Sequence, residues 1–306
     1  MRSSAWMLVA AAWVATAAGC GQVYRAEADR FTNLSGGAGY DRGLVIALSG
    51  VGGVLGEVER IRQGLAQGGV ECAIEEFDWS AGDMLVDQTD LAANKAKARM
   101  LTRRIETYFT EHPGCPVHLF GVSAGTGLVV WALEDLEPGR RVDNVVLIAS
   151  SLSARYDLRG ALRKVGGRLY NHYSAVDGVL GVMVPAAGTV DRAAGLAGGL
   201  RGFRAPSGAE PLYGERLQQV GWSTEDSRWG HVGSHMGATQ PPYVREYMAP
   251  LAWARKPTVV PQGQSATGCL QPVSFEEHWL QATSGTPRIA SNAALALATD
   301  APAPSP

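Results

Sequence analysis

The chain has 306 residues, a hydrophobic fraction of 46% and a formal net charge of -2. This length suits one large domain or two small ones, and the hydrophobic fraction is ordinary for a globular protein. A charge so close to zero provides no basic field, so we expect no nucleic-acid partner.

The first 20 residues have the pattern of a signal peptide. A positive charge near the start is followed by an uncharged apolar run that is too short to span a membrane. Residues 17–20, Ala-Ala-Gly-Cys, resemble a bacterial lipobox, which predicts lipidation at Cys20 and a membrane contact only through that lipid. The alternative is an ordinary signal peptide that is cut near Ala18 or Gly19. Both interpretations predict an exported protein, held in the cell envelope or released.

Three further cysteines, Cys72, Cys115 and Cys269, allow at most one disulfide among them. A disulfide would suit an exported protein, but the sequence does not indicate which two would pair. Their spacings fit no metal site, so we expect no metal.

Apolar runs alternate with helical patterns through the middle of the chain. The first run, at 44–48, is continuously apolar, which is typical of a buried parallel strand. Strands are expected at 44–48, 70–77, 117–120, 142–148, 168–173 and 217–222, and helices from 58 to a glycine stop at 68–69, and over 86–111, 126–133 and 242–253. This alternation predicts an α/β fold with a doubly wound, mostly parallel sheet flanked by helices.

The composition changes at both ends of the expected domain and once within it. Residues 21–42 are polar and Gly-rich and are expected to be a leader to a domain over 43–256. Within the domain, residues 186–210 are rich in glycine and alanine and have little periodicity, so we expect a surface insertion beside the site. Residues 257–306 are expected to be a largely disordered extension, because their Ala/Pro/Ser-rich end cannot bury a core.

The sequence Gly-Val-Ser-Ala-Gly at 121–125 stands between a predicted strand and a predicted helix. Strand, G-x-S-x-G and helix is the arrangement of a nucleophile elbow, in which Ser123 would be the nucleophile. The sharp turn brings the main chain close to its neighbours, so only small residues fit two positions either side of the serine. The chain has 38 glycines, so the pattern alone is weak. The alternative is a Gly-rich turn with a serine helix cap.

An acid and two histidines follow later strands, at the carboxyl edge where open parallel sheets bind their ligands. Asp177 follows the strand at 168–173, and His231 and His235 follow the strand at 217–222. The order Ser, Asp, His is the chain order of α/β-hydrolases.

The chain resembles bacterial α/β-hydrolases of the lipase and esterase type from about residue 44 to residue 251. The segments that carry the resemblance are 48–53, 121–125, the stretch around Asp177, 188–192, and 233–236 running into 243–247. The segments at 188–192 and 233–247 also resemble those of exported planctomycete proteins of hydrolase type. The resemblance implies an α/β-hydrolase fold, a small-molecule ester substrate and no cofactor. It places the family histidine at His235, with His231 as the alternative base.

The expected chemistry requires these residue types. A serine hydroxyl is a poor nucleophile until a base takes its proton. Histidine can accept and return that proton near neutral pH, and an aspartate fixes its tautomer. Main-chain amides stabilise the oxyanion, and we expect those of Ala124, after the nucleophile, and Val51, in the turn after the first strand. The sequence therefore predicts a serine esterase that forms an acyl-enzyme on Ser123.

The other acidic residues and histidines are less consistent with a catalytic role. Asp157 follows the fourth strand and is the reserve acid, whereas Asp143 precedes that strand and stands at the wrong edge of the sheet. Asp191 is expected to brace its loop through an ion pair with Arg192. The remaining histidines, expected to be structural, are His112, His118, His172 and His278.

Three other functions were weighed. An inactive hydrolase fold could serve as a binding module on a surface lipoprotein, because fold does not imply activity. A metallohydrolase is disfavoured because the chain has neither H-E-x-x-H nor H-x-x-E-H. Dinucleotide binding is disfavoured because residues 50–53 do not continue into G-x-G-x-x-G, position 55 being Leu55.

Overall fold

The computed structural model describes residues 30–53 and 55–253. Most of the predicted domain is therefore described. The predictions that lie outside the described residues concern the signal peptide at 1–20, lipidation of Cys20, the extension at 257–306, Cys269 and His278.

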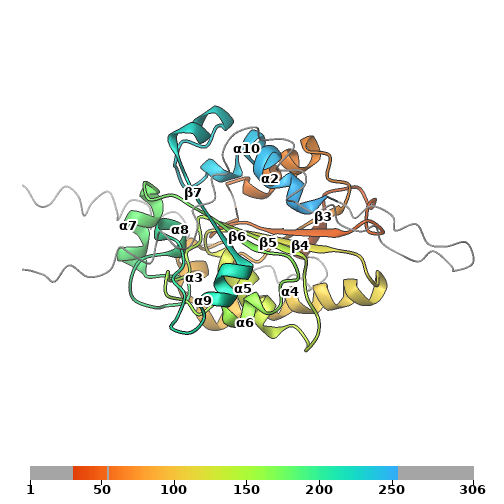
Figure 1. Cartoon of the computed structure of the whole chain (residues 1–306), viewed down its shortest axis with the longest axis horizontal. Helices are drawn as coiled ribbons and strands as arrows, with labels where there is room; N and C mark the ends of the chain where they lie inside the picture. Colours follow the sequence, from red (N-terminus) through yellow and green to blue (C-terminus); the bar gives the residue numbers. More distant parts are fainter. Residues whose placement is uncertain (1–29, 54, 254–306) are drawn as a thin grey trace, which may run out of the picture.

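Seven strands form one sheet in the order β1-β3-β2-β4-β5-β6-β7 (Figure 1). The strands are β1 (Phe31–Asn33), β2 (Leu44–Leu48), β3 (Ala73–Phe77), β4 (Val117–Val122), β5 (Asn144–Ile148), β6 (Leu169–Tyr173) and β7 (Leu217–Gly221). All neighbours pair in parallel except β1, which runs antiparallel to β3. From β2 the chain adds strands first on one side and then on the other. The predicted doubly wound, mostly parallel α/β sheet is therefore confirmed.

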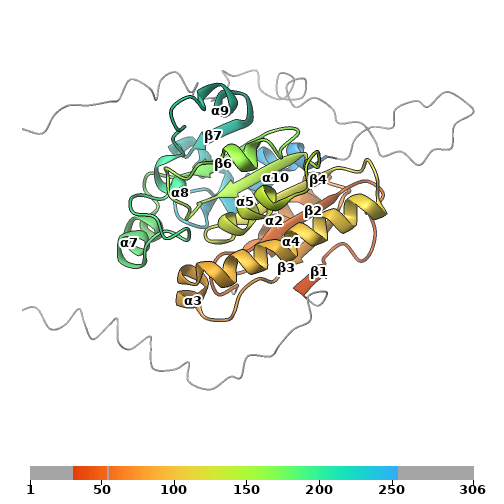
Figure 2. The ribbon, with the colours of Figure 1, turned by 90° about the horizontal axis from the view of Figure 1, so that it is seen from below.

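Helices cover both faces of the sheet. The helices are α2 (Glu57–Gln67), α3 (Met84–Thr89), α4 (Leu91–Glu111), α5 (Gly125–Asp135), α6 (Arg159–Leu162), α7 (Gly178–Ala187), α8 (Gly198–Arg201), α9 (Glu210–Arg216) and α10 (Pro241–Tyr247). Helices α2 and α10 lie on one face, and α4, α5, α6 and α9 lie on the other (Figures 1 and 2). Three 3-10 turns complete the described chain: η2 (Thr224–Trp229), η3 (Gly237–Thr239) and η4 (Ala249–Ala252). Within residues 30–53 and 55–253, no helix has the length and apolar character needed to cross a bilayer.

The sheet separates two hydrophobic clusters. In β2, Leu44, Ile46 and Leu48 pack into the cluster that includes α4 and α5, while Val45 and Ala47 pack into the cluster that includes α2 and α10. All five residues are fully buried. A strand that is buried on both faces has no position for a polar side chain, which explains the continuously apolar run at 44–48.

Part of the predicted leader belongs to the sheet. Residues 31–33, within the range 21–42, form β1 and pair with β3, and the Phe31 ring stacks on Phe77 with centroids 4.5 Å apart. A three-residue edge strand has too few residues to produce a periodic pattern, so its sequence resembles a loop.

The helix expected over 86–111 is two helices. The side chain of Asp83 accepts hydrogen bonds from two amides at the start of α3, and that of Asp90 accepts one from Ala93 at the start of α4. Aspartate favours such caps over helix interiors because its carboxylate binds nearby main-chain amides. The helix expected over 242–253 similarly ends at Tyr247 and is followed by the separate turn η4.

The segment at 186–210 is not wholly a surface insertion. Residues 197–200 are buried, and α8 consists of the last three of them together with Arg201. The amide of Gly199 donates to the Ser150 carbonyl at 2.8 Å, and its carbonyl accepts from the Ser174 amide at 2.9 Å. A β-carbon at Gly199 would overlap the main chain of Ala149 and Ser150. The small residues therefore let this segment pack between the ends of β5 and β6.

The structure also distinguishes the described cysteines. Cys115 is disulfide-bonded, whereas Cys72 is a free, buried thiol. Burial raises the pKa of the Cys72 thiol to about 12. A thiol that stays protonated at neutral pH is a poor nucleophile, so Cys72 is a structural residue.

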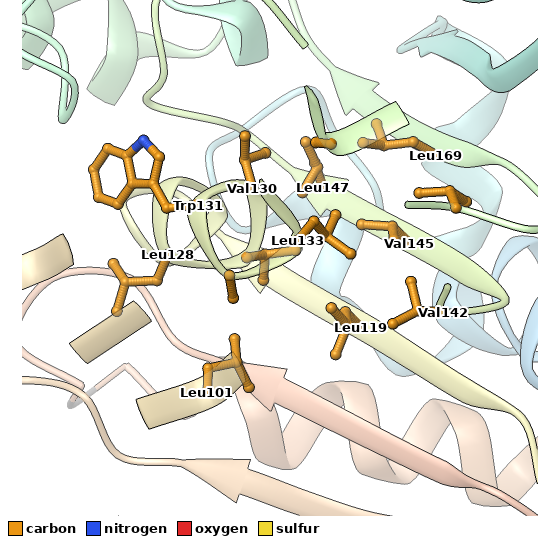
Figure 3. Packing of buried hydrophobic residues seen from close by; sticks show 14 of the residues in the cluster. Leu101, Leu119, Leu128, Val130, Trp131, Leu133, Val142, Val145, Leu147 and Leu169 are labelled. Atoms are coloured by element: carbon orange, nitrogen blue, oxygen red, sulfur yellow. The ribbon is translucent and has the colours of Figure 1, made fainter. Parts of the chain in front are cut away.

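Core packing predicts that truncating a side chain at the centre of β4 destabilises the fold strongly. Leu119 is fully buried between Leu101 of α4 and Val145 of β5 (Figure 3). We expect Leu119→Ala to lower the free energy of unfolding by about 2 to 5 kcal/mol, because it removes packed methyl groups and leaves a cavity. The measurement is denaturant unfolding. The control is Leu85→Ala, at a position that is 63% exposed, with an expected change of at most about 0.5 kcal/mol. Equal losses in the two variants would contradict this core.

Candidate active site

Ser123 lies on the turn between β4 and α5. Its φ of 52° falls in the left-handed region, which residues with a side chain rarely adopt. Its carbonyl accepts hydrogen bonds from the Thr126 hydroxyl at 2.5 Å and from the amides of Thr126 and Ser151 at 3.2 Å each. Its amide donates to the Ile148 carbonyl at 2.9 Å. A strained residue held by this many bonds is typical of a functional turn.

The two glycines of the motif are required by close main-chain contacts. A β-carbon at Gly121 would lie 3.0 Å from the Thr126 α-carbon. A β-carbon at Gly125 would overlap the Ser49 carbonyl oxygen. The spacing G-x-S-x-G therefore reflects the space available on each side of Ser123.

The turn after β2 lies against Ser123. A β-carbon at Gly50 would lie 3.2 Å from the β-carbon of Ser123 and 3.8 Å from its hydroxyl oxygen. Neither the Val51 amide nor the Ala124 amide donates a hydrogen bond to any residue in the described part of the chain. Of the two predicted oxyanion-hole amides, that of Ala124 directly follows Ser123 and that of Val51 directly follows Gly50, and neither has an acceptor among the described residues.

Asp177 and His235 form a hydrogen-bonded pair. Asp177 Oδ2 lies 2.7 Å from His235 Nδ1, and the two side chains are 1% and 10% exposed. Asp177 Oδ1 accepts hydrogen bonds from the amides of Val179 and Leu180, at 3.0 Å each, in the first turn of α7. Amides at a helix N-terminus favour the ionised carboxylate. The aspartate is thus held in an orientation that can fix a histidine tautomer.

Ser123 and the Asp177–His235 pair lie at the same edge of the sheet, because each follows the carboxyl end of a parallel strand. Between the described residues, the structure has no hydrogen bond from the Ser123 hydroxyl to His235.

His231 occupies a different environment from His235. It is 3% exposed, and its ring packs edge-on against Tyr243 with centroids 4.8 Å apart. Its Nδ1 accepts from the Gly233 amide at 3.3 Å, and its carbonyl accepts from Trp222 Nε1 at 2.7 Å. Burial lowers the pKa of the His231 imidazole to about 4. These contacts are typical of a structural histidine that supports the loop leading to His235.

The other acids lie in surroundings unlike that of Asp177. Asp157 is about half exposed and forms an ion pair with Arg159 at 2.5 Å. Asp143 accepts a hydrogen bond from the Val117 amide, at the start of β4 and so at the opposite edge of the sheet. Asp191 accepts from the Ser153 amide at 2.9 Å, and Arg192 donates to the Ala187 carbonyl. These last two residues brace the loop through the main chain, so the predicted ion pair between them is wrong.

The remaining described histidines are held inside the fold or at its surface. The Nδ1 of His172 lies 3.1 Å from the Tyr243 hydroxyl, and burial lowers the pKa of His172 to about 3. His118 is buried within β4. The ring of His112 stacks on Tyr108 with centroids 4.8 Å apart.

No protein-family model and no curated protein matches this chain. Solved structures with a similar arrangement include lipase B from Aspergillus fumigatus, with 12% identity, a TM-score of 0.46, and coverage of 74% of this chain and 57% of that one. A cutinase-like protein from Cryptococcus sp. has 17% identity and a TM-score of 0.38, covering 69% and 93%. A lipase-esterase related protein from Clostridium acetobutylicum has 13% identity and a TM-score of 0.38, covering 71% and 96%.

The match with lipase B spans less than two thirds of that protein. Similarity at these identities and scores does not indicate an activity. The site contains the predicted serine, aspartate and histidine, together with both predicted amides, at one edge of a parallel sheet.

Several residues that organise the site were not found from the sequence. The Thr126 hydroxyl binds the Ser123 carbonyl, Trp79 Nε1 donates to the Ser49 carbonyl at 2.9 Å, and Asp87 accepts from the Gly52 amide at 3.0 Å. Because Thr126 directly follows the motif, the sequence alone could have indicated that it supports the turn at Ser123. Trp79 and Asp87 have no motif and reach the turn through tertiary contacts.

The low pKa of His231 predicts a pH dependence of stability. The folded state keeps this imidazole neutral down to about pH 4, whereas the unfolded chain protonates it near 6.5. Its stabilising contribution is therefore complete above pH 6.5 and is lost as the pH falls toward 4. We expect His231→Gln to reduce the slope of unfolding free energy against pH, between pH 5 and 6, by about 1 kcal/mol per pH unit. Denaturant unfolding at several pH values measures this, and an unchanged slope would contradict a buried neutral His231.

Proposed function

We propose that this protein is a serine hydrolase of the α/β-hydrolase superfamily that cleaves carboxylic esters through an acyl-enzyme on Ser123. The observation that carries the proposal is the hydrogen bond between Asp177 and His235, at the sheet edge where Ser123 occupies a strained turn. A buried aspartate that fixes a histidine tautomer, at the sheet edge that also carries a serine on a strained turn, supports acyl transfer, which requires all three groups.

In the proposed mechanism, His235 Nε2 takes the hydroxyl proton of Ser123 while the serine oxygen attacks the ester carbonyl carbon. The tetrahedral oxyanion then collapses, the carbon–oxygen bond to the alcohol breaks, and the imidazolium returns the proton to the departing alcohol. Water repeats the sequence on the acyl-serine and releases the carboxylic acid. Asp177 remains ionised throughout, holds the Nδ1 proton of His235 and stabilises the imidazolium.

The amides of Ala124 and Val51 would bind the oxyanion. Ala124 follows the nucleophile and directly precedes α5, and the turn that contains Val51 lies against Ser123. Donors that are already oriented cost no reorganisation as charge develops, and each is typically worth about 3 to 4 kcal/mol.

Exposed apolar side chains around Asp177 favour an ester with an apolar portion. Val176, Val179, Val182 and Met183 are 60%, 46%, 67% and 49% exposed, and the last three belong to α7. α7 has no charged residue. Such a surface binds hydrocarbon more readily than it binds a charged or strongly hydrated substrate.

We also propose that the protein is exported from a bacterial cell, with a lipid on Cys20 or with the signal peptide removed near it. The apolar N-terminal segment supports this, and a disulfide at Cys115 suits an oxidising compartment.

The nucleophile is tested by covalent labelling. We expect a fluorophosphonate probe to label the full chain, and labelling and p-nitrophenyl butyrate hydrolysis to disappear in Ser123→Ala. Ser151→Ala is the matched control, because this neighbouring serine is 2% exposed and lies beside the same turn. If wild type and Ser123→Ala are labelled equally or not at all, the enzyme proposal fails and a binding module is favoured.

The base is tested by comparing the two histidines. We expect His235→Ala to lower kcat by about 10³- to 10⁴-fold, because Ser123 then lacks its proton acceptor. His231→Ala should mainly lower thermal stability, since that ring is packed on Tyr243. Steady-state kinetics and thermal unfolding on both variants measure this. Loss of activity in His231→Ala alone would assign the base to His231.

A further inference from the structure

The amides on either side of Val51 are both bound by buried carboxylates. The Gly52 amide donates to Asp87 Oδ2 at 3.0 Å, and the Gly50 amide donates to Glu57 Oε1 at 3.4 Å. Asp87 and Glu57 are 0% and 2% exposed. The Val51 amide between them has no acceptor among the described residues. The turn is thus held on both sides of the Val51 amide, which has no acceptor in the described part of the chain.

The hydrogen bond to Asp87 is the shorter of the two, and other polar groups replace the water that this carboxylate loses on burial. Its Oδ2 also accepts from the Ser80 hydroxyl at 2.5 Å, its Oδ1 accepts from the Ala81 amide at 2.9 Å, and Lys97 Nζ lies 3.6 Å from Oδ1. A carboxylate is buried at low cost only when hydrogen bonds and a counter-charge replace water. Lys97 also balances a negative charge that would otherwise oppose an oxyanion nearby.

A second contact from the same region holds the beginning of the turn. Trp79 Nε1 donates to the Ser49 carbonyl at 2.9 Å, and Lys97 Nζ lies 5.3 Å from the centre of the Trp79 ring. The turn is therefore held at the Ser49 carbonyl and at the Gly52 amide by residues between β3 and α4. Gly50 in this turn is the residue that lies against Ser123.

We propose that Asp87 is a positioning residue for the oxyanion hole, which keeps the Val51 amide directed at the substrate oxygen by holding the neighbouring Gly52 amide. This inference rests on the proposed function. Oxyanion donors are effective only when they are oriented in advance, and loss of one donor typically costs about 10²- to 10³-fold in kcat. A donor that is displaced but still present should lower kcat by less than its complete removal would. Asp87 would therefore affect the transition state more than the bound substrate.

The test is Asp87→Asn in the full chain. An asparagine has one acceptor oxygen, which cannot serve the Gly52 amide, the Ala81 amide and the Ser80 hydroxyl together. We expect kcat for p-nitrophenyl butyrate to fall by about 10- to 100-fold, with KM within about threefold of wild type. Binding of a trifluoromethyl ketone, which forms a tetrahedral adduct on serine, should weaken by a similar factor.

The matched control is Asp83→Asn. Asp83 precedes α3 by one residue, is exposed and caps that helix without contacting the turn at 49–53. We expect wild-type kcat in this variant. A kcat in Asp87→Asn equal to that of Asp83→Asn, in a protein whose Ser123 is labelled, would overturn the inference and leave the proposed function intact. Absence of labelling in wild type would instead reject the proposed function and this inference with it.

A second variant separates positioning from stability. In Asp87→Asn, Lys97 loses its counter-charge, so the fold itself is weakened. The double variant Asp87→Asn/Lys97→Met removes that unpaired charge and should recover thermal stability, while kcat stays low because Gly52 still lacks its carboxylate acceptor. If the double variant regains wild-type kcat together with its stability, Asp87 is merely structural and the inference fails. If Asp87→Asn does not fold, the double variant serves as the test.

Discussion

The close approach of three main-chain segments at Ser123 is the constraint on which the site depends. The turn after β2, the turn after β4 and the first turn of α5 meet there. A side chain would not fit at Gly125, and a β-carbon at Gly50 would crowd the β-carbon of Ser123. This packing holds Ser123 at a φ of 52°. It also brings the turn that contains Val51 against the turn that contains Ser123 and Ala124, which no single element could do.

Two buried aspartates organise what surrounds the serine, and they do so by the same physical means. Asp177 binds two amides of α7 and His235, while Asp87 binds the amides of Gly52 and Ala81 and lies beside a lysine. In each case the main-chain amides replace the water that an ionised carboxylate loses on burial. One carboxylate orients the histidine, and the other holds the turn that carries Val51.

Much of the fold followed from local patterns. The run at 44–48 indicated a buried strand because a sheet covered on both faces excludes polar residues, and the G-x-S-x-G spacing indicated the turn at Ser123 because side chains do not fit beside it. The short strand β1 and the buried segment at 197–200 were missed. Their residues are small or few, and their positions depend on distant strands rather than on their own periodicity.

The sequence by itself determined the order of strand, nucleophile turn and helix, and placed an acid and two histidines after later strands, because those features depend on residues close in the chain. The resemblance favoured His235 over His231, but only the tertiary structure showed the physical difference between their surroundings. The two lie four positions apart, but one meets the carboxylate of Asp177 and the other packs on Tyr243. The same holds for Asp87, which reaches the turn beside Ser123 only because β3 and β2 pair. Contacts between distant segments decide the burial and the charged neighbours of each residue, and these give two like residues in one loop different surroundings.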